Sequence, residues 1–458
     1  MLQVSEWITK GTGLLVVAVS IAAIGGCGGG GGGGAGAVSN PPPPSASPPP
    51  PLPPPPPPTG GTQFTKVLVL GGSTAAGFQS SGISAATQRQ AYGALLATMA
   101  GAPFAIPELA GTGCPAPVTA PLAPANSTAG GCTRAAALPA ATTGQLAAVP
   151  LTRVGEALVV ASGNFAAFDS LFIGSRSQVQ VAQQVSPTFL VVHLGDDDVL
   201  PAAITGILGP LAGGGDPQLT EQSTFSTQYN QLIGDVASAS IAGGVLIGVT
   251  NPLLYSPLLQ PGAFLHAARD ATNRFEGKLV NANCSLVTAL GTPNPLSNNL
   301  VSLRILADVV APEINCDPAQ LGAGSPYLID AQEQATLTAR VDQFNSVISS
   351  IATSRNWIYV DVNALLAPLR AETTSGRTDR LRKCQLLPGA TTAAQLQTAV
   401  LFSCPVTGAT AAPNRFGSLS SFDAIYPSAE FHRLLAVKLA TDINAKYATT
   451  VSTTLPPP

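Results

Sequence analysis

Short apolar runs alternate with longer amphipathic stretches along most of the chain. The apolar runs predict strands, while the spacing of apolar positions between them favours helices. Because strands that alternate with helices form βα units, the pattern predicts an α/β fold built on a mostly parallel sheet of five strands. The strands are expected at Lys66–Leu70, Thr188–Leu194, Gly244–Thr250 and Trp357–Val362, with a weaker one near Phe104–Leu109.

Two helices are predicted by clear periodicity. Apolar residues recur at three- and four-residue steps across Ala331–Ser354 and at four-residue steps across Ala429–Tyr447. Such residues share one face of a helix, which is expected to pack into the core. The segments Ser256–Tyr327 and Gly376–Leu419 lack this periodicity, so we expect them to be excursions over the sheet that are pinned by disulfides.

The first 61 residues differ from the rest of the chain. Lys10 and the apolar run from Leu14 to Ile24 have the layout of a signal peptide over residues 1–27. The sequence Ile24-Gly25-Gly26-Cys27 resembles a bacterial lipobox, which implies a lipid anchor on Cys27 in the cell envelope; an ordinary signal peptide and a short anchor helix are the alternatives. Residues 28–61 are nearly all glycine and proline and predict a disordered tether. One domain is expected at 62–450, followed by a disordered tail at 451–458.

Six cysteines follow Cys27, an even number in a chain with an export signal, which favours disulfides. Zinc is the alternative, but no CxxC motif or nearby histidine supports it. Because each cysteine lies close to one neighbour in the sequence, the predicted pairs are Cys114–Cys132, Cys284–Cys316 and Cys384–Cys404.

Charge argues against a nucleic-acid partner. The chain has 21 Lys and Arg residues, 24 Asp and Glu residues and a net charge of -3. No basic cluster is present, so nucleic-acid binding is not expected. Neither a Walker pattern nor a GxGxxG fingerprint occurs, and we expect no cofactor, no metal ion and a monomer.

The stretch from Val67 to Gly82 carries the first candidate for chemistry. Its apolar run ends at Gly71-Gly72, and Ser73 follows directly. Ligands in open α/β sheets bind beyond the carboxyl ends of the strands. Ser73 is therefore expected at the mouth of a binding site.

Three separate motifs resemble the SGNH (GDSL-type) hydrolase family. The motif Gly71-Gly72-Ser73-Thr74-Ala75-Ala76-Gly77-Phe78 is similar to the family's GDSLxxGF block. Gly195-Asp196-Asp197-Asp198 is similar to GxND, and Asp423-Ala424-Ile425-Tyr426-Pro427-Ser428 is similar to DxxHP[TS]. Their order and their positions relative to the predicted strands match the family across residues 65–447.

The resemblance implies a three-layer αβα, flavodoxin-like fold and an activity, ester hydrolysis through an acyl-enzyme on Ser73. It implies that Asp423 orients a base and that the backbone N–H groups of Ser73 and Gly163 form an oxyanion hole. The implied substrate is a small acyl ester.

Two departures from the family pattern bear on activity. The first is Tyr426, which stands where the family has its basic histidine. A phenol is almost wholly protonated at neutral pH, so it can hydrogen-bond Asp423 but cannot serve as an efficient base. His193 and His432 are the candidate substitutes for that base, while His266 cannot be placed from the sequence.

The second departure is Asp197, which stands where the family has an asparagine that donates a hydrogen bond to the oxyanion. Only a protonated Asp197 could donate in this way. The three aspartates in a row also suggest a cation site, whereas a solvated turn with Asp198 as a helix cap is the simpler interpretation. Gly72 replaces an aspartate that is largely architectural in the family.

Two hypotheses follow from these motifs. The first is an exported serine ester hydrolase of the carboxylesterase or lipase type, with its activity impaired by Tyr426 and Asp197. The second is a non-catalytic envelope lipoprotein that kept the pocket for binding or the fold as a scaffold.

Overall fold

The computed structural model describes residues 61–123, 132–160, 166–211, 214–237, 241–311, 313–321, 326–370, 380–382 and 415–455. The expected signal peptide and tether lie outside these ranges, as does most of the second excursion. So do four of the predicted site residues, namely Cys27, Gly163, Cys384 and Cys404. Within the described ranges, no helix is long and apolar enough to cross a membrane.

A six-stranded sheet forms the centre of the molecule. Its strands lie in the order β12-β5-β4-β1-β3-β2, and every neighbouring pair is parallel. The α/β class and the parallel sheet were predicted, but the predicted number of five strands was wrong. The missed strand is β3, which has only three residues. The bounds are β1 (Val67–Gly71), β2 (Phe104–Ala105), β3 (Gly144–Leu146), β4 (Phe189–His193), β5 (Gly243–Ile247) and β12 (Ile358–Val360).

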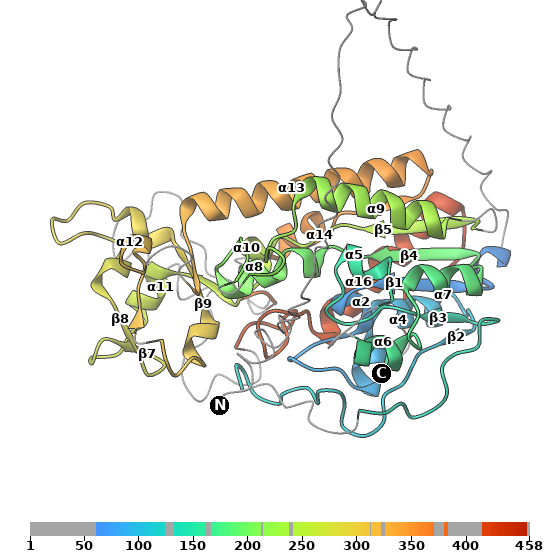
Figure 1. Ribbon diagram of the computed structural model, residues 1–458, viewed down its shortest axis with the longest axis horizontal. Coiled ribbons are helices and arrows are strands. Elements are labelled where there is room, and N and C mark those ends of the chain that lie inside the picture. The colour runs from blue at the N-terminus through green and yellow to red at the C-terminus, as the bar shows by residue number, and fades with distance from the viewer. Residues whose placement is uncertain are drawn as a thin grey trace, which may run out of the picture.

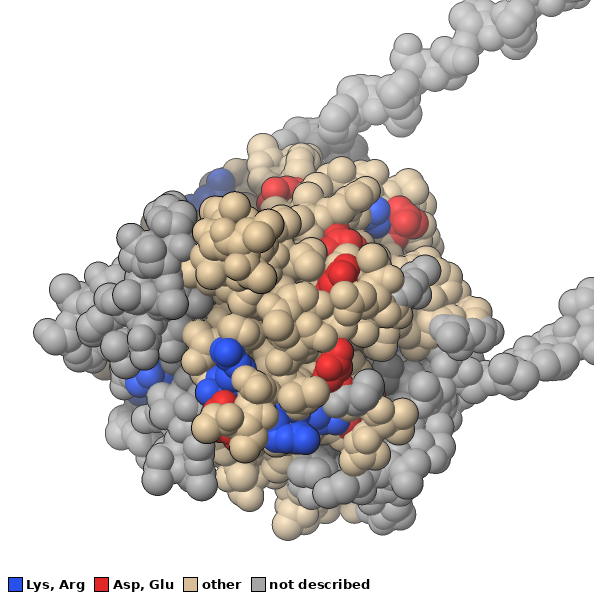
Figure 2. All heavy atoms as spheres, turned by 90° about the vertical axis from the view of Figure 1, so that its left-hand side faces the viewer, with Lys and Arg blue, Asp and Glu red and all other residues tan. Residues whose placement is uncertain are grey.

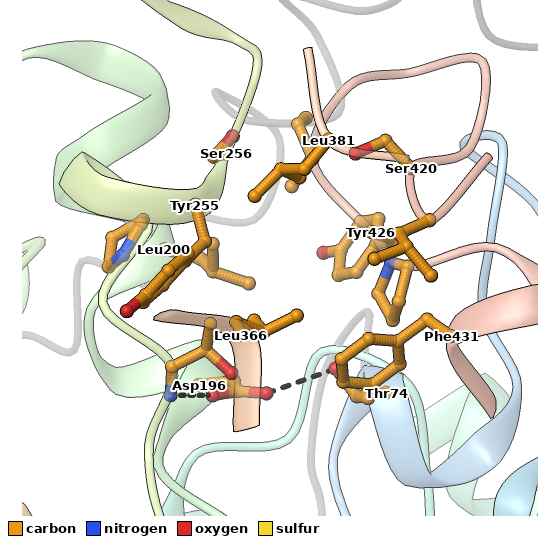
Figure 3. Close-up of a pocket in the computed structure, with 15 residues that line it drawn as sticks. Thr74, Asp196, Leu200, Tyr255, Ser256, Leu366, Leu381, Ser420, Tyr426 and Phe431 are labelled. Carbon is orange, nitrogen blue, oxygen red and sulfur yellow. Dashed lines mark hydrogen bonds between the residues drawn. The ribbon is translucent and has the colours of Figure 1, made fainter. Parts of the chain in front are cut away.

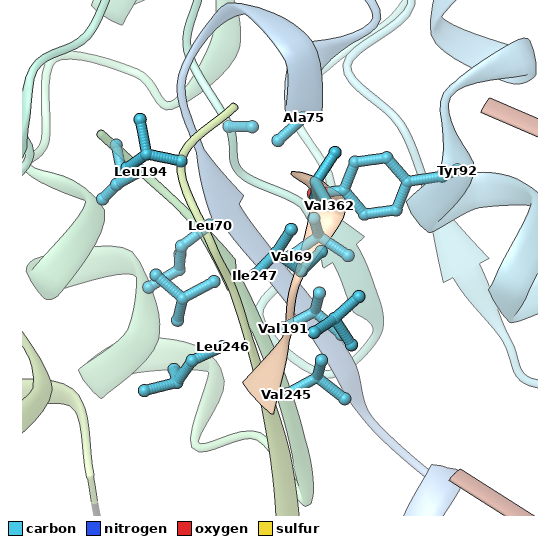
Figure 4. Packing of buried hydrophobic residues seen from close by; sticks show 14 of the residues in the cluster. Val69, Leu70, Ala75, Tyr92, Val191, Leu194, Val245, Leu246, Ile247 and Val362 are labelled. Atoms are coloured by element: carbon cyan, nitrogen blue, oxygen red, sulfur yellow. The ribbon is translucent and has the colours of Figure 1, made fainter. Parts of the chain in front are cut away.

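The central strands are buried on both faces, which is why they read as continuous apolar runs. Their register aligns Val69, Val191 and Val245 in one row across the sheet. Figure 4 shows these three valines on one side of the sheet, with Leu70 and Leu246 on the other. The register therefore builds a core on each face.

Helices cover both faces of the sheet (Figure 1). On one face α4 approaches β1 closely, because a Cβ at Gly93 would lie 2.8 Å from Val69. On the other face α9 and α13 pack together through stacked rings of Phe225 and Phe344, with centroids 3.7 Å apart. The predictions for α13 (Ala331–Ser354) and α16 (Ala429–Tyr447) are confirmed. The remaining elements of this domain are η1 (Gly61–Phe64), α2 (Ser73–Ala76), α3 (Ala85–Gln90), α4 (Tyr92–Met99), α5 (Val154–Ala157), α6 (Ala166–Phe172), α7 (Gln178–Val185), η3 (Asp196–Asp198), α8 (Leu200–Thr205), α9 (Gln222–Val236), α10 (Pro252–Tyr255) and α14 (Val362–Arg370).

Residues Ser256–Tyr327, here called the insertion, form a small unit with its own core around Phe264, Phe275 and Val301. Figure 1 shows this unit beside the sheet rather than over its face, which differs from the predicted excursion. It contains two three-stranded sheets, β10-β8-β7 and β11-β9-β6. Their strands have only two or three residues, which is too short to produce a periodic pattern in the sequence. Its elements are β6 (Leu259–Pro261), α11 (Gly262–Ala267), β7 (Arg274–Phe275), β8 (Lys278–Val280), η4 (Ala282–Cys284), η5 (Pro295–Asn298), β9 (Leu300–Ser302), η6 (Leu303–Leu306), β10 (Glu313–Ile314) and α12 (Pro318–Leu321), with β11 (Leu328–Ile329) following.

Two of the predicted disulfides are confirmed, Cys114–Cys132 and Cys284–Cys316. Disulfides persist in oxidising environments, so both bonds are typical of a secreted protein. Figure 2, which faces the insertion, shows a surface with few charged side chains among the described residues. The described chain ends beyond α16, where Val451 is buried against the core.

Candidate functional site

Ser73 lies at the carboxyl end of β1, where the chain changes direction across the sheet. Strand β3 pairs on one side of β1, whereas β4 pairs on the other, and Gly71 lies opposite His193. Such a switch point opens a crevice between the loops that follow neighbouring strands. The loops after β1 and β4 therefore bring the first two motifs together.

The hydroxyl of Ser73 is enclosed and fully occupied by hydrogen bonds. It donates to Asp197 Oδ1 at 2.8 Å and accepts from the backbone N–H of Leu151 at 2.8 Å. The Ser73 residue is 0% exposed. Its backbone N–H, which the resemblance assigned to an oxyanion hole, donates to Asp197 Oδ2 at 2.8 Å. Asp197 thus occupies both the hydroxyl and the backbone N–H of Ser73.

Asp197 has an unusual protonation equilibrium. Burial raises the pKa of its carboxyl from 3.8 to about 7, against the two hydrogen bonds from Ser73, which lower it. The neighbouring charges of Asp196 and Asp198 also raise it. At neutral pH Asp197 is therefore divided between its acid and its carboxylate, and both oxygens face Ser73 as hydrogen-bond acceptors.

Gly72 and Asp197 both differ from the motifs of the family that the sequence resembles, and one packing arrangement explains both. A Cβ at position 72 would lie 2.2 Å from Asp197 Oδ2 and 3.0 Å from the carbonyl oxygen of Thr152. A side chain at 72 would therefore displace the Asp197 carboxyl group. Glycine at 72 is what lets this carboxyl group reach Ser73.

Asp198 does not lie in a solvated turn, so that prediction was wrong. Its side chain is 0% exposed and accepts hydrogen bonds from the backbone N–H of Val154 at 3.0 Å and from Thr220 Oγ1 at 2.8 Å. Helix α8 begins at Leu200, and its cap residue is Val199. Burial raises the pKa of Asp198 to about 6. Asp198 thus links the segments at Val154 and Thr220 to the loop that follows β4.

Tyr426 lies beside Ser73 and is buried. Burial raises the pKa of its phenol well above the ordinary value, and Asp197 raises it further, whereas a hydrogen bond with the Ser73 side chain lowers it. The phenol therefore stays protonated near neutral pH. Tyr426 can hold Ser73 or a ligand by a hydrogen bond, but it cannot take a proton from either.

Asp423 closes its own loop instead of bonding the phenol of Tyr426. Its Oδ1 accepts from Ser421 Oγ at 2.9 Å and from the backbone N–H groups of Ile425 and Tyr426 at 2.8 and 3.0 Å. Its Oδ2 accepts from the backbone N–H of Ser81 at 2.5 Å. The Asp423 carboxylate therefore stabilises its own loop and links it to Ser81.

Arg304 of the insertion is a charged neighbour that the sequence did not reveal. Burial lowers the pKa of its guanidinium, whereas Asp423 and Tyr426 raise it. One of its nitrogens lies 3.4 Å from Ser81 Oγ. No motif marks this position, because Arg304 reaches the site only through the fold of the insertion.

His193 and His432 lie behind the site and do not reach Ser73 among the described contacts. His193 Nε2 is 3.2 Å from Asp196 Oδ2, and the His193 ring is 1% exposed. His432 Nδ1 accepts weakly from the backbone N–H of Tyr92 at 3.4 Å. Burial, followed by the charge of His193, lowers the pKa of His432 to about 3. These contacts give neither imidazole a proton path to Ser73.

His266 lies in the insertion, on α11. Burial lowers the pKa of His266 to about 4, and the charge of Arg269 lowers it further. Its neighbours are residues of its own helix end, so the structure connects it with none of the three motifs.

A pocket opens next to Ser73 and is lined by its neighbour Thr74 (Figure 3). Asp196 forms part of the floor, and the walls include Tyr255, Tyr426 and Phe431. Most other lining residues are aliphatic or proline. Sequence reasoning singled out the three motifs but missed this pocket, because residues from α10, α14 and the loop before α16 complete it.

Asp196 is the most acidic member of the aspartate run. Burial acts to raise its pKa, but the charge and hydrogen bond of His193 and the hydrogen bonds from Thr250 and Thr74 bring it below the ordinary value. Among the residues that the structure describes, no group of three or more His, Cys, Asp or Glu side chains could hold a metal ion. The three aspartates of the run accept hydrogen bonds from other residues of the chain.

Comparisons with known proteins identify no family. The chain matches no protein-family model, and no curated protein is significantly similar to it. What the fold and the site define is an α/β protein with a parallel sheet and a pocket at the carboxyl ends of its strands.

Proposed function

We propose that this chain is an exported protein with an SGNH-type fold that binds a small ligand beside Ser73 without hydrolysing it efficiently. Five strands support the fold assignment: β3-β1-β4-β5-β12 lie in the flavodoxin-like order 2-1-3-4-5 when they are numbered along the chain. The three motifs also meet at one edge of this sheet. The two-residue β2 extends the sheet by a sixth strand.

The hydrogen bonds of Ser73 carry the functional proposal. An acyl-enzyme requires a base that takes the serine proton and donors that stabilise the oxyanion. Ser73 Oγ instead lies between Asp197 and the Leu151 N–H, beside a protonated phenol. An ionised Asp197 would repel an oxyanion, and its carboxyl group already occupies the Ser73 N–H. Among the described residues a pocket remains beside Ser73, whereas no histidine contacts its hydroxyl and its own N–H is already bonded to Asp197.

A slow serine hydrolase is the second candidate, and one observation favours it. Asp197 accepts the Ser73 proton at 2.8 Å, and its pKa of about 7 is suited to a general base at neutral pH. In that mechanism Asp197 takes the proton of Ser73 while Oγ forms a bond to the acyl carbon, and it then gives that proton to the departing alcohol. Water next attacks the acyl-enzyme and loses a proton to Asp197, and the acid leaves as Ser73 Oγ regains its proton. The substrate would be a small acyl ester.

One experiment separates the two candidates. The full chain is assayed on short-chain aryl esters beside Ser73→Ala and, as a matched control, Ser350→Ala on the exposed side of α13. Binding without turnover predicts that all three proteins stay at the background rate. Activity that disappears in Ser73→Ala but persists in Ser350→Ala would overturn it in favour of the hydrolase.

A restored site provides the complementary test. The variant that combines Tyr426→His with Asp197→Asn replaces the phenol by a base and the carboxyl by an amide donor. If the site geometry is that of a decayed hydrolase, this variant gains Ser73-dependent esterase activity of at least about tenfold over the parent. No gain would argue against descent from an esterase site.

We also propose that the chain is anchored in the bacterial envelope through Cys27 and acts there as a monomer, without a nucleic-acid partner. The two disulfides support export, and the lipobox-like sequence supports the anchor. Radiolabelled palmitate should enter the parent chain in a bacterial host but not Cys27→Ala. Equal labelling of both would exclude Cys27 as the anchor.

A further inference from the structure

The pocket beside Ser73 combines aromatic walls with a single acid. Among the described residues that line it, Asp196 is the one with a charged side chain. Figure 3 shows Tyr255 on one wall and Tyr426 with Phe431 on the other, above Asp196 and Thr74. Aromatic faces that surround a carboxylate attract a cation by their quadrupoles and exclude water from it.

The aromatic side chains are fixed by contacts outside the pocket. Tyr255 donates its hydroxyl to the carbonyl oxygen of Asn363 at 2.9 Å. The ring of Tyr426 packs edge-on against Phe78, with centroids 4.9 Å apart. Because these contacts already hold the rings, a ligand does not have to order them on binding.

Asp196 retains capacity for a ligand. A carboxylate has about four acceptor positions. Oδ1 accepts from the backbone N–H of Thr250 at 2.9 Å, and Oδ2 accepts from Thr74 Oγ1 at 3.0 Å and faces His193 at 3.2 Å. The side chain of Asp196 is 10% exposed, and it is exposed to the pocket.

The surroundings of Asp196 are acidic. Asp196 and Asp198 act electrostatically on Asp197, Asp196 acts on Asp198, and Asp198 acts on Glu156, and each of these interactions helps to raise a pKa. The basic groups nearby are Arg153, His193 and Arg304, of which Arg304 acts on the pocket-wall residue Tyr426. Arg304 does not line the pocket and is directed to Asp423. The local field therefore favours a positive ligand head.

We infer that the pocket binds a small ligand with an alkylammonium head, which contacts Asp196 and lies between Tyr255 on one wall and Tyr426 and Phe431 on the other. The inference rests on the proposed function, because it names the ligand class of the same pocket. A compact ammonium with methyl groups fits best, because aromatic faces and a carboxylate both attract it. An anionic head would be repelled by Asp196.

The test compares two probes of one shape. Choline carries the ammonium, whereas dimethylbutanol is its neutral isostere, with carbon in place of nitrogen. Calorimetric titration of the full chain is expected to show choline binding at least about tenfold tighter than dimethylbutanol, as a desolvated cation–π contact and an ion pair imply. Asp196→Asn should remove this preference, and Asp235→Asn, an exposed site on α9, should preserve it.

A second variant keeps the test decisive if Asp196→Asn does not fold. Tyr255→Leu keeps the pocket apolar but removes one aromatic face, so it should weaken choline at least about threefold and leave dimethylbutanol unchanged. Equal affinities of the parent for both probes would overturn the inference while leaving a ligand-binding pocket intact. Binding of neither probe would overturn the inference, and the esterase and restoration assays would then decide the proposed function independently.

Discussion

Replacing Asp197 by asparagine should remove a loss of stability that the parent suffers as the pH rises. Burial raises the pKa of Asp197 from 3.8 to about 7 in the folded state. The folded protein therefore retains a proton that the unfolded chain has already released between these pH values. For this group the contribution to stability is fully present below about pH 4 and is lost as the pH rises to about 7.

The magnitude follows from the size of the pKa change. A rise from 3.8 to about 7 spans about three pH units, each equivalent to about 1.4 kcal/mol. The free energy of unfolding should fall by on the order of 4 kcal/mol across this range because of Asp197 alone. Asparagine does not ionise, and its amide oxygen can still accept a hydrogen bond from Ser73.

Urea denaturation of the full chain measures this effect. Parent, Asp197→Asn and the exposed control Asp235→Asn are compared at about pH 5 and about pH 8. The free energy of unfolding of Asp197→Asn, relative to that of the parent, should increase by at least about 2 kcal/mol from about pH 5 to about pH 8. For Asp235→Asn the same difference should change by less than about 0.5 kcal/mol. If the free energy of unfolding of Asp197→Asn and of the parent varied with pH in the same way, the argument that the pKa of Asp197 is raised in the folded state would be refuted.

Three further substitutions test other contacts. Gly72→Ala should destabilise the protein by about 1–3 kcal/mol, because the added Cβ would clash with Asp197. Asp197→Ala in the same chain should recover part of this loss. Additive effects in a double-mutant cycle would contradict the clash. Replacing Cys284 and Cys316 by alanine should cost about 3–4 kcal/mol in urea denaturation, because their bond spans 32 residues, and an unchanged midpoint would be the opposing result. His432 is buried with a pKa of about 3, so the parent loses stability as the pH falls from 6.5. His432→Gln should reduce this loss by up to about 4 kcal/mol. Identical acid-unfolding curves for the parent and His432→Gln would contradict this prediction.

The strands that build the site were predictable because they are buried on both faces. β1, β4 and β5 consist of apolar residues and glycine up to His193 at the end of β4, and the carboxyl ends of β1 and β4 carry the first two motifs. β3 (Gly144–Leu146) was not predictable, since its sequence Gly-Gln-Leu does not form an apolar run. The position of the insertion was predicted wrongly because its short strands are held together by a shared core, which the sequence of each strand does not indicate.

The aspartate run shows where local reasoning fails. Three adjacent acids look alike in sequence, yet each has a different partner: Asp196 contacts Thr74 and His193, Asp197 contacts Ser73, and Asp198 contacts Thr220 and Val154. A cap or a solvated turn was the simpler expectation for Asp198. The correct environment depends on loops 22 and 44 residues away in the chain.

The sequence by itself determined five strands of the central sheet, the helices α13 and α16, two disulfide pairs and the position of Ser73 after the first strand, because burial, spacing and glycine act locally. Tertiary structure alone decided what surrounds that serine. It brought Asp197 into the space left by Gly72, placed both nearby histidines behind the site and assembled an aromatic pocket from three distant segments. Protonation and access depend on such long-range contacts, and so the chemistry of Ser73 could not be deduced from its motif.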